Sequence, residues 1–289
     1  MSLDLSARQR AMLLEMNIRV WTPTATASPA QPSTPQAATV QAPIRPTPSM
    51  AVPTAAPVRM PPMQAPADAP AQRVDVGDLD WRALQEAVAQ CRACSLCRTR
   101  HQTVFGVGGG ADTPDSGAPR ADWLIVGEAP GEQEDLQGEP FVGKAGQLLD
   151  NMLAAMGLSR RTTATATPAL TPLREVYIAN VLKCRPPGNR NPDPVEVSQC
   201  QPYLQRQIAL LQPKLILAMG RFAAQTLLAE TIPDVQTMAL GKLRGRVHRY
   251  RSLPVVVTYH PAYLLRAPAE KAKSWADLCL ALDTAKQMG

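Results

Sequence analysis

The sequence predicts a three-layer α/β/α fold with a four-stranded, mainly parallel sheet, preceded by a disordered N-terminal extension. Short apolar runs alternate with longer segments of helical periodicity, and a distinctive loop follows each run. This alternation is typical of open sheets in which helices connect parallel strands. The expected strands are residues 122–126 (DWLIV), 176–181 (VYIANV), 215–219 (LILAM) and 254–258 (PVVVT).

The N-terminal extension has two parts. Residues 1–21 place apolar side chains at helical spacing and predict a short amphipathic helix. Residues 22–75 hold 12 prolines between Pro29 and Pro70 and few large apolar side chains. Such a segment cannot bury enough surface to offset its chain entropy, so we expect a disordered linker. The tethered helix is suited to docking on a partner protein, or alternatively to packing back on the domain.

The folded domain is expected over residues 78–289. Its expected helices are residues 81–90, 145–156, 194–211, 221–229 and 270–288. In open α/β sheets, ligands bind outside the carboxyl ends of the strands. We therefore expect the loops that follow the strands to converge on one site.

Composition excludes several classes of protein. No run of about 18 apolar residues exists, so no membrane span is expected. The N-terminus lacks the basic start, apolar core and cleavage site of a secretory signal, which favours the cytoplasm. A net charge of +6 suits a partner that carries phosphates, and equally a soluble protein that is merely basic.

Cysteine usage indicates a metal or catalytic site, because disulfides are rare in the cytoplasm. A CxxC motif and three further cysteines precede the last expected helix: Cys91, Cys94, Cys97, Cys184 and Cys200. Four thiolates from such a set can hold zinc or an iron–sulfur cluster, and ordinary reduced thiols are the alternative. Cys279 lies in an apolar helical pattern, which is typical of a core thiol.

Two motifs follow the first expected strand. Residues 127–135 (GEAPGEQED) hold four carboxylates, which suit general base catalysis, water positioning or cation stabilisation, or else form an acidic surface loop. In residues 138–150 (GEPFVGKAGQLLD), Phe141 precedes a helix. It can stack on a planar base, or serve as a hydrophobic staple of that helix.

The later loops carry polar and basic side chains. Asn180 ends the second strand, where its amide can read a base edge or simply form a turn. Lys183, Arg185 and Arg190 suit phosphate contacts. His260 is placed to bond a substrate oxygen, with a structural histidine as the alternative. Two leucines follow it, Leu264 and Leu265, and we expect them to be exposed as an apolar wedge for a base stack.

Together these motifs resemble the family 4 uracil-DNA glycosylases, which carry an iron–sulfur cluster. GEAPGEQED, GEPFVGKAGQLL, NVLKCRPPGNRNP and HPAYLLR match that family in order and spacing, over about residues 88–285. The resemblance implies a DNA repair enzyme that hydrolyses the N-glycosidic bond of deoxyuridine in single- or double-stranded DNA, and we expect it to act as a monomer. It would release uracil and leave an abasic site.

The resemblance also implies a [4Fe-4S] cluster with a structural role. Its ligands would be Cys91, Cys94, Cys184 and Cys200. Cys97 falls where the family commonly has another residue, so it is not expected to be a ligand.

The same resemblance assigns roles around a flipped-out uracil. Phe141 would stack on the base, Asn180 would read its N3 and O4 edge, and His260 would bond O2.

The resemblance assigns further roles around this base. Glu128 and Glu134 would orient water or stabilise the sugar cation, and Gly127 and Ala129 would contact the substrate beside them. Leu264 would fill the space left by the flipped nucleotide, and Arg266 would touch the DNA backbone. The bulk of Glu134 is the candidate for rejecting the 5-methyl group of thymine.

Two rival hypotheses keep some of these features. A zinc-containing nucleic-acid-binding protein without activity would explain the cysteines and the charge, but not GEAPGEQED or His260. A related glycosylase that bonds covalently to the abasic site would need a nucleophilic histidine in an extra basic loop. His248 lies in GKLRGRVHRYRSLP, which shows no clear insertion of that type.

Overall fold

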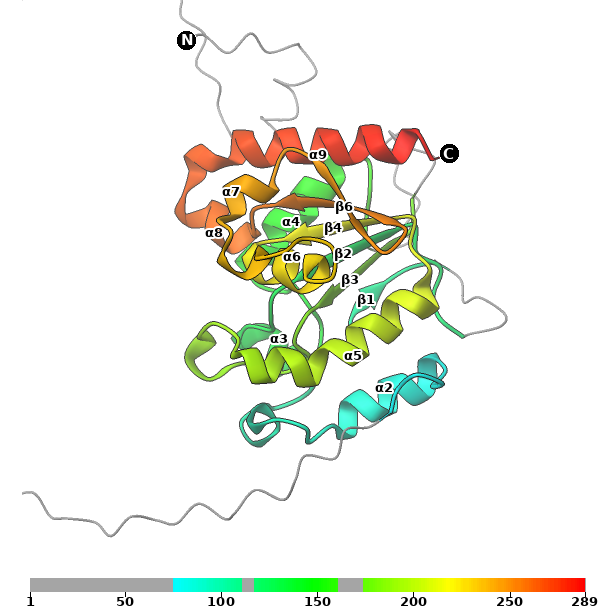
Figure 1. Ribbon diagram of the computed structural model, residues 1–289. Helices are drawn as coiled ribbons and strands as arrows, with labels where there is room; N and C mark the ends of the chain where they lie inside the picture. Colours follow the sequence, from blue (N-terminus) through cyan, green and yellow to red (C-terminus); the bar gives the residue numbers. More distant parts are fainter. Residues whose placement is uncertain (1–74, 111–116, 161–173, 289) are drawn as a thin grey trace, which may run out of the picture. The chain divides into compact units, whose positions relative to one another are not determined.

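The computed structural model describes residues 75–110, 117–160 and 174–288 (Figure 1). The helix expected over residues 1–21, and the expected linker except for its last residue, lie outside this range. No helix in the described ranges is long and apolar enough to span a bilayer.

A mixed sheet forms the middle of the domain, with the strand order β1-β3-β2-β4-β6-β5. The four predicted strands are confirmed as β2 (Trp123–Gly127), β3 (Val176–Asn180), β4 (Leu215–Met219) and β6 (Leu253–Thr258), and they run parallel. Two antiparallel edge strands bring the described sheet to six, namely β1 (Val107–Gly108) and β5 (Val247–Tyr250). Neither contains an apolar run, which is why the sequence did not predict them.

Five of the helices were predicted: α2 (Trp81–Gln90), α4 (Lys144–Ala155), α5 (Pro194–Leu211), α6 (Arg221–Leu228) and α9 (Lys271–Lys286). Caps fix two of the starts. Asp80 accepts a hydrogen bond from the Ala83 N–H at the start of α2, and Asp193 and Glu196 form a capping box on α5. Short helices that were not predicted occupy three loops, namely α3 (Glu132–Gln137), α7 (Leu240–Leu243) and α8 (Pro261–Arg266).

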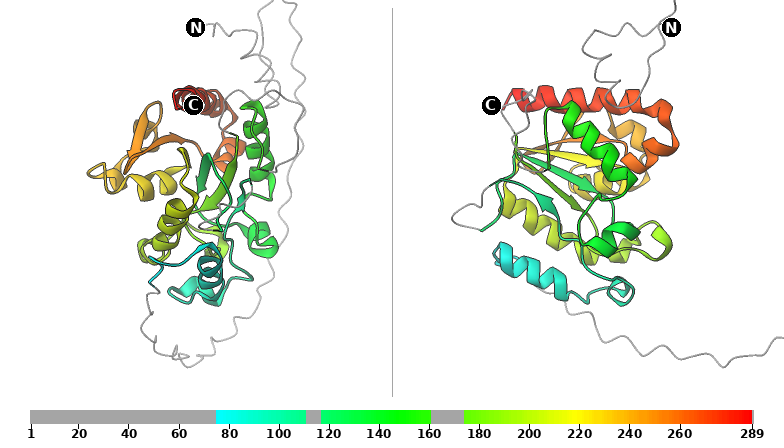
Figure 2. Two further views of the ribbon diagram at one scale, coloured as in Figure 1. Left: turned by 90° about the vertical axis from the view of Figure 1, so that its right-hand side faces the viewer. Right: turned by 180° about the vertical axis from the view of Figure 1, so that it is seen from behind.

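The expected three layers are present. Figures 1 and 2 show α2 and α5 over one face of the sheet, and α4 and α9 over the other. Alternate strand residues supply the two cores: Leu124 and Val126 face the layer of α2, α5 and α6, while Trp123 and Ile125 face the layer of α4 and α9. The parallel strands are therefore buried on both faces, as sheets covered by helices on both sides require.

Candidate active site

A cleft of about 740 Å³ lies at the carboxyl ends of the parallel strands. Its walls come from the segments that follow β2, β3, β4 and β6, so the strand order brings four separate loops together. Among the lining residues are Glu128, Glu134, Phe141, Arg190, Arg221, Tyr259, His260 and Arg266. The sequence-predicted residues of three loops thus share one site.

Next to the cleft, Asn180 at the end of β3 and Gly127 at the end of β2 lie against the cleft residue Phe141, and we call this group of residues the slot. A Cβ on Gly127 would lie 2.3 Å from Asn180 Oδ1 and 2.7 Å from Phe141 Cζ, so only glycine fits there. Asn180 is 1% exposed, and among the described residues neither its Oδ1 nor its Nδ2 has a hydrogen-bond partner. An unpaired buried amide costs about 1–3 kcal/mol, which a ligand edge with one donor and one acceptor would recover.

The ring of Phe141 forms one side of this slot. It stacks on the His260 ring, with centroids 5.3 Å apart and planes inclined by 27°. The backbone at Phe141 has a φ of 56°, which side chains rarely adopt. Its N–H donates to Glu134 Oε1 at 2.8 Å, and the Gly131 N–H donates to Glu134 Oε2 at 2.9 Å. Glu134 thus holds two backbone segments with its two oxygens.

His260 caps the start of α8. The Ala262 N–H donates to its Nδ1 at 3.2 Å, which assigns the ring proton to Nε2. Burial, with a smaller contribution from the charge of Arg266, lowers the pKa of His260 to about 4. The imidazole is therefore neutral at physiological pH and available as a hydrogen-bond donor.

Glu128 follows β2 directly and lines the cleft. No hydrogen bond or ion pair within the described residues engages its carboxylate. Burial raises the pKa of Glu128 to about 6, although the nearby charge of Arg221 acts in the opposite direction. A carboxyl group with such a pKa is poised to exchange protons near neutral pH. Ala129, beside it in the cleft, has no polar side-chain atom.

The expectation that Leu264 is exposed is wrong. HPAYLLR is not a loop, because α8 begins at Pro261 and turns the Leu264 side chain into the core beside α4, where it is 0% exposed. Its neighbours Tyr263 and Leu265 are 39% and 43% exposed. Leu264 therefore cannot enter a base stack, and these two neighbours reach outward from α8, as does Arg266.

Lys183 is also not a phosphate contact. It is 1% exposed, and its Nζ donates to the Asn180 carbonyl at 2.9 Å and to Gln207 Oε1 at 2.6 Å. These bonds connect the end of β3 to α5 and so stabilise the backbone at Asn180. Arg190 does line the cleft, but both of its terminal nitrogens donate to Glu196.

Sequence reasoning missed several cleft residues. Arg221 and Phe222 begin α6, and the Arg221 guanidinium lies 4.8 Å from the Phe222 ring centroid. Tyr259 packs on Tyr263 with centroids 5.0 Å apart. The dipeptide GR after the third strand and the tyrosines around His260 were the available signals. Their role depends on the arrangement of loops, which periodicity does not give.

Five cysteines line one pocket between η1 (Ser95–Arg98), the segment after β3 and α5: Cys91, Cys94, Cys97, Cys184 and Cys200. Arg100 Nη1 donates to Cys184 Sγ at 3.1 Å, and the Lys183 N–H donates to Cys200 Sγ at 3.2 Å. Hydrogen bonds of this kind stabilise cluster thiolates, so the donor set fits an iron–sulfur group. As the side chains stand, no three His, Cys, Asp or Glu residues in the described ranges are arranged to hold a metal ion.

The cysteine segment is linked to the cleft. His101 follows it, and both its N–H and its Nδ1 bond the Asp135 carboxylate, with Nδ1 2.8 Å from Oδ2. Asp135 is 1% exposed and is the neighbour of Glu134 on α3. His248, by contrast, bonds the Leu243 carbonyl from the edge strand β5 and does not line the cleft.

Comparisons with known proteins agree with this geometry. A sequence model of the Uracil DNA glycosylase superfamily matches residues 114–279. A type-4 uracil-DNA glycosylase of Archaeoglobus fulgidus is 40% identical over 185 residues, which cover 63% of this chain and 81% of that protein. One from Pyrobaculum aerophilum is 36% identical over 206 residues, covering 70% and 93%. A type-5 uracil-DNA glycosylase of the same organism is 31% identical over 157 residues, covering 54% and 67%.

Proposed function

Because the chain belongs to the uracil-DNA glycosylase superfamily and to its type-4 members, we propose that it hydrolyses the N-glycosidic bond of deoxyuridine in DNA. Uracil is released and an abasic site is left, as base excision repair requires. One observation carries the proposal: the Asn180 amide, unpaired within the described residues, is buried against Gly127 and against Phe141, which lines the cleft that a planar base would enter. The base must leave the duplex to enter this slot.

The slot discriminates between bases through the Asn180 amide. Uracil presents an N3–H donor beside the O4 acceptor, which complement the Oδ1 acceptor and the Nδ2 donor. Cytosine presents the opposite pattern, an acceptor at N3 and a donor at N4. A site that leaves buried polar groups unpaired rejects the wrong ligand strongly. Phe141 supplies the stacking surface.

His260 acts on the leaving base. Negative charge develops on uracil O2 as the glycosidic bond breaks, and the neutral ring donates from Nε2 to that oxygen. A fixed donor of this kind acts mainly in the transition state, because the charge exists only there. Because the pKa of His260 is about 4, the ring is already neutral when the base enters, and no proton has to leave it first.

Glu128 is the carboxylate for water and the sugar cation. Its side chain is unengaged in the described residues, whereas Glu134 uses both oxygens on backbone N–H groups. Ala129 offers no alternative base. We therefore assign Glu128 to the attacking water and Glu134 to holding the slot, where its bulk remains our candidate for excluding the thymine methyl group.

Two arginines at the edge of the cleft are proposed to contact the DNA. Arg266 and Arg221 line the cleft mouth with exposed side chains that suit phosphates of a single- or double-stranded substrate. Action as a monomer, a protein partner for residues 1–21 and a cytoplasmic location are further proposals that rest on the sequence.

The cysteine pocket is proposed to hold a [4Fe-4S] cluster on Cys91, Cys94, Cys184 and Cys200, with Cys97 outside the ligand set. The converging thiols and the donors from Arg100 and Lys183 support this assignment. When bound, the cluster supplies a structural crosslink between the segment before β1 and the start of α5. The chain's own residues carry out the chemistry in the cleft.

The test is uracil release from a 5′-labelled oligonucleotide with a single U, beside the same strand with T. Alkali then cuts any abasic site. Cleavage at U alone is expected. Folded protein that leaves the U strand intact would remove the assigned activity, and iron analysis would then decide between an iron–sulfur protein and a zinc protein that binds nucleic acid.

A further inference from the structure

The peptide bond between Pro140 and Phe141 is held at both ends by charged side chains. Arg160 Nη1 donates to the Pro140 carbonyl at 2.9 Å. On the other side of the same peptide group, the Phe141 N–H donates to Glu134 Oε1 at 2.8 Å. A cation on the oxygen and an anion on the hydrogen fix the plane of the peptide, since bonds to charged groups are about twice as strong as neutral ones.

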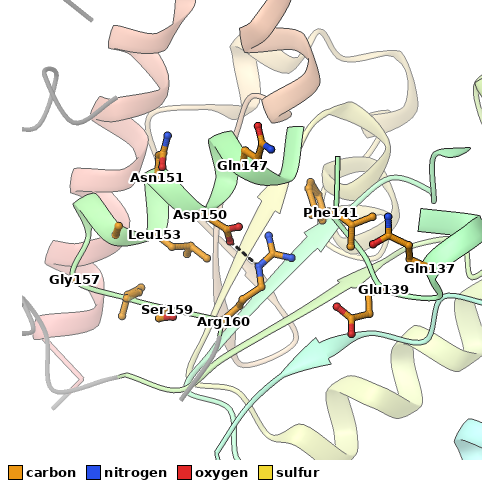
Figure 3. Close-up of a pocket in the computed structure, with 13 residues that line it drawn as sticks. Gln137, Glu139, Phe141, Gln147, Asp150, Asn151, Leu153, Gly157, Ser159 and Arg160 are labelled. Carbon is orange, nitrogen blue, oxygen red and sulfur yellow. Dashed lines mark hydrogen bonds and ion pairs between the residues drawn. The ribbon is translucent and has the colours of Figure 1, made fainter. Parts of the chain in front are cut away.

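Arg160 is itself anchored. Its Nε donates to Asp150 Oδ1 on α4 at 2.6 Å, the contact drawn in Figure 3. The Arg160 side chain is 9% exposed, so it is not a solvated surface arginine. It lines a second pocket, which shares Phe141 with the cleft. Arg160 thus connects the residue before Phe141 to the helix after it.

Such a clamp is needed because the backbone at Phe141 is strained. An aromatic residue with a φ of 56° is an outlier that costs about 1–3 kcal/mol and persists only where its surroundings fix it. The packing tolerance is small, since a Cβ on Gly146 would lie 1.6 Å from the Phe141 carbonyl oxygen. A change of the 140–141 peptide would move the ring away from His260 and from the slot.

We propose that Arg160 is a positioning residue of the uracil site, which acts with Glu134 on the 140–141 peptide to hold the Phe141 ring where it stacks on the base. The inference rests on the proposed function. Electrostatics agree with it: burial raises the pKa of Glu134, and the positive charge of Arg160 works against that rise. Arg160 therefore also helps to keep the Glu134 carboxylate ionised for its two acceptor bonds.

The first test separates turnover from binding. For Arg160→Gln we expect kcat for uracil release to fall by about 10²-fold, as for misplacement of a reacting group by an ångström, with little change in the Kd for DNA. Arg160→Lys, which keeps a cation near Pro140, should recover part of the loss. Arg251→Gln is the matched control, because Arg251 is 61% exposed and pairs with Glu230 away from the cleft. Loss of DNA affinity with unchanged kcat would overturn the proposal.

A second test does not depend on activity. Hydrogen exchange at the Phe141 amide should be about tenfold faster in Arg160→Gln, the size expected when a charge-assisted bond weakens, while amides in the middle of α4 keep their rates. In the double variant Arg160→Gln with Glu134→Gln, the increase in the activation free energy of uracil release should be smaller than the sum of the increases in the two single variants. Uniformly faster exchange, or additive losses, would mean that Arg160 only stabilises the fold and would refute the clamp. Wild-type protein that releases no uracil would refute the proposed function instead, and leave the exchange result to decide the clamp.

Discussion

At the residue scale, His260 is the group most closely tied to the departing base. Its Nδ1 is occupied by the Ala262 N–H, so only Nε2 can donate into the cleft. We expect His260→Ala to lower the single-turnover rate of uracil release by about 10²-fold or more, as for loss of one oxyanion donor. His248→Ala is the matched control, because His248 bonds a backbone carbonyl outside the cleft. An unchanged rate for His260→Ala would remove His260 from the mechanism.

The pH dependence of activity should report Glu128. Burial raises its pKa to about 6, so the carboxylate is ionised above that pH and protonated below it. Activity should therefore fall as the pH drops through about 6, whereas His260, with its pKa near 4, stays neutral over this range. The measurement is the pH profile of the single-turnover rate.

Two matched variants test whether Glu128 causes this fall in activity at low pH, the acidic limb of the profile. Glu128→Gln should be much slower and should lose the limb, while Glu132→Gln, whose side chain is 62% exposed, should keep both rate and profile. If the limb near pH 6 survives in Glu128→Gln, another carboxyl group controls it and the water must be assigned elsewhere.

The element scale shows what the sequence could predict and what it could not. Strands β2, β3, β4 and β6 were predicted because each is buried on both faces and reads as an unbroken apolar run. The short helices α3 and α8 were not, since six residues that begin after glycine or at proline carry loop signals. This is why Leu264 was expected to be exposed. In a loop both leucines could face solvent, but in the helix α8 Leu264 faces inward while its neighbours Tyr263 and Leu265 face outward.

The start of α4 sets the position of Phe141. Gly146 lies in the first turn of this helix, and an added Cβ would meet the Phe141 backbone at 1.6 Å from its oxygen, where no flexible side chain can move aside. Gly146→Ala should therefore displace Phe141. Expressed as free energies, the loss in kcat for uracil release should be larger than the loss in stability against unfolding. Gly241→Ala is the control, since a Cβ at that helical position meets no atom within 4 Å. Full activity of Gly146→Ala would show that the slot tolerates such a shift.

At the scale of the whole molecule, two regions far apart in sequence depend on each other. The cysteine segment contacts α5 through the thiol pocket, and through His101 it is bonded to Asp135 on α3, next to the cleft residue Glu134. The sequence could predict each group of motifs, but their connection depends on Asp135 being turned inward on α3, away from Glu134. Only the three-dimensional arrangement shows that the cysteine segment is bonded to α3, the helix that also carries Glu134.

This connection predicts the behaviour of Cys184→Ser. Cys184 is buried, with its sulfur bonded to Arg100, and burial raises the pKa of its thiol to about 11, so the thiolate needs a bound metal to form. We expect the variant to lose iron, to melt at a lower temperature and to lose activity as the link through His101 loosens. Iron and sulfide content, visible absorbance and thermal melting measure these changes.

Two other cysteine variants are the controls. Cys279 on α9 lies outside the pocket, so Cys279→Ser should keep its iron, and so should Cys97→Ser if the ligands are the four proposed. Full iron content in Cys184→Ser would show that the Cys184 thiol is not a required ligand, and loss of iron in Cys97→Ser would show that Cys97 is one.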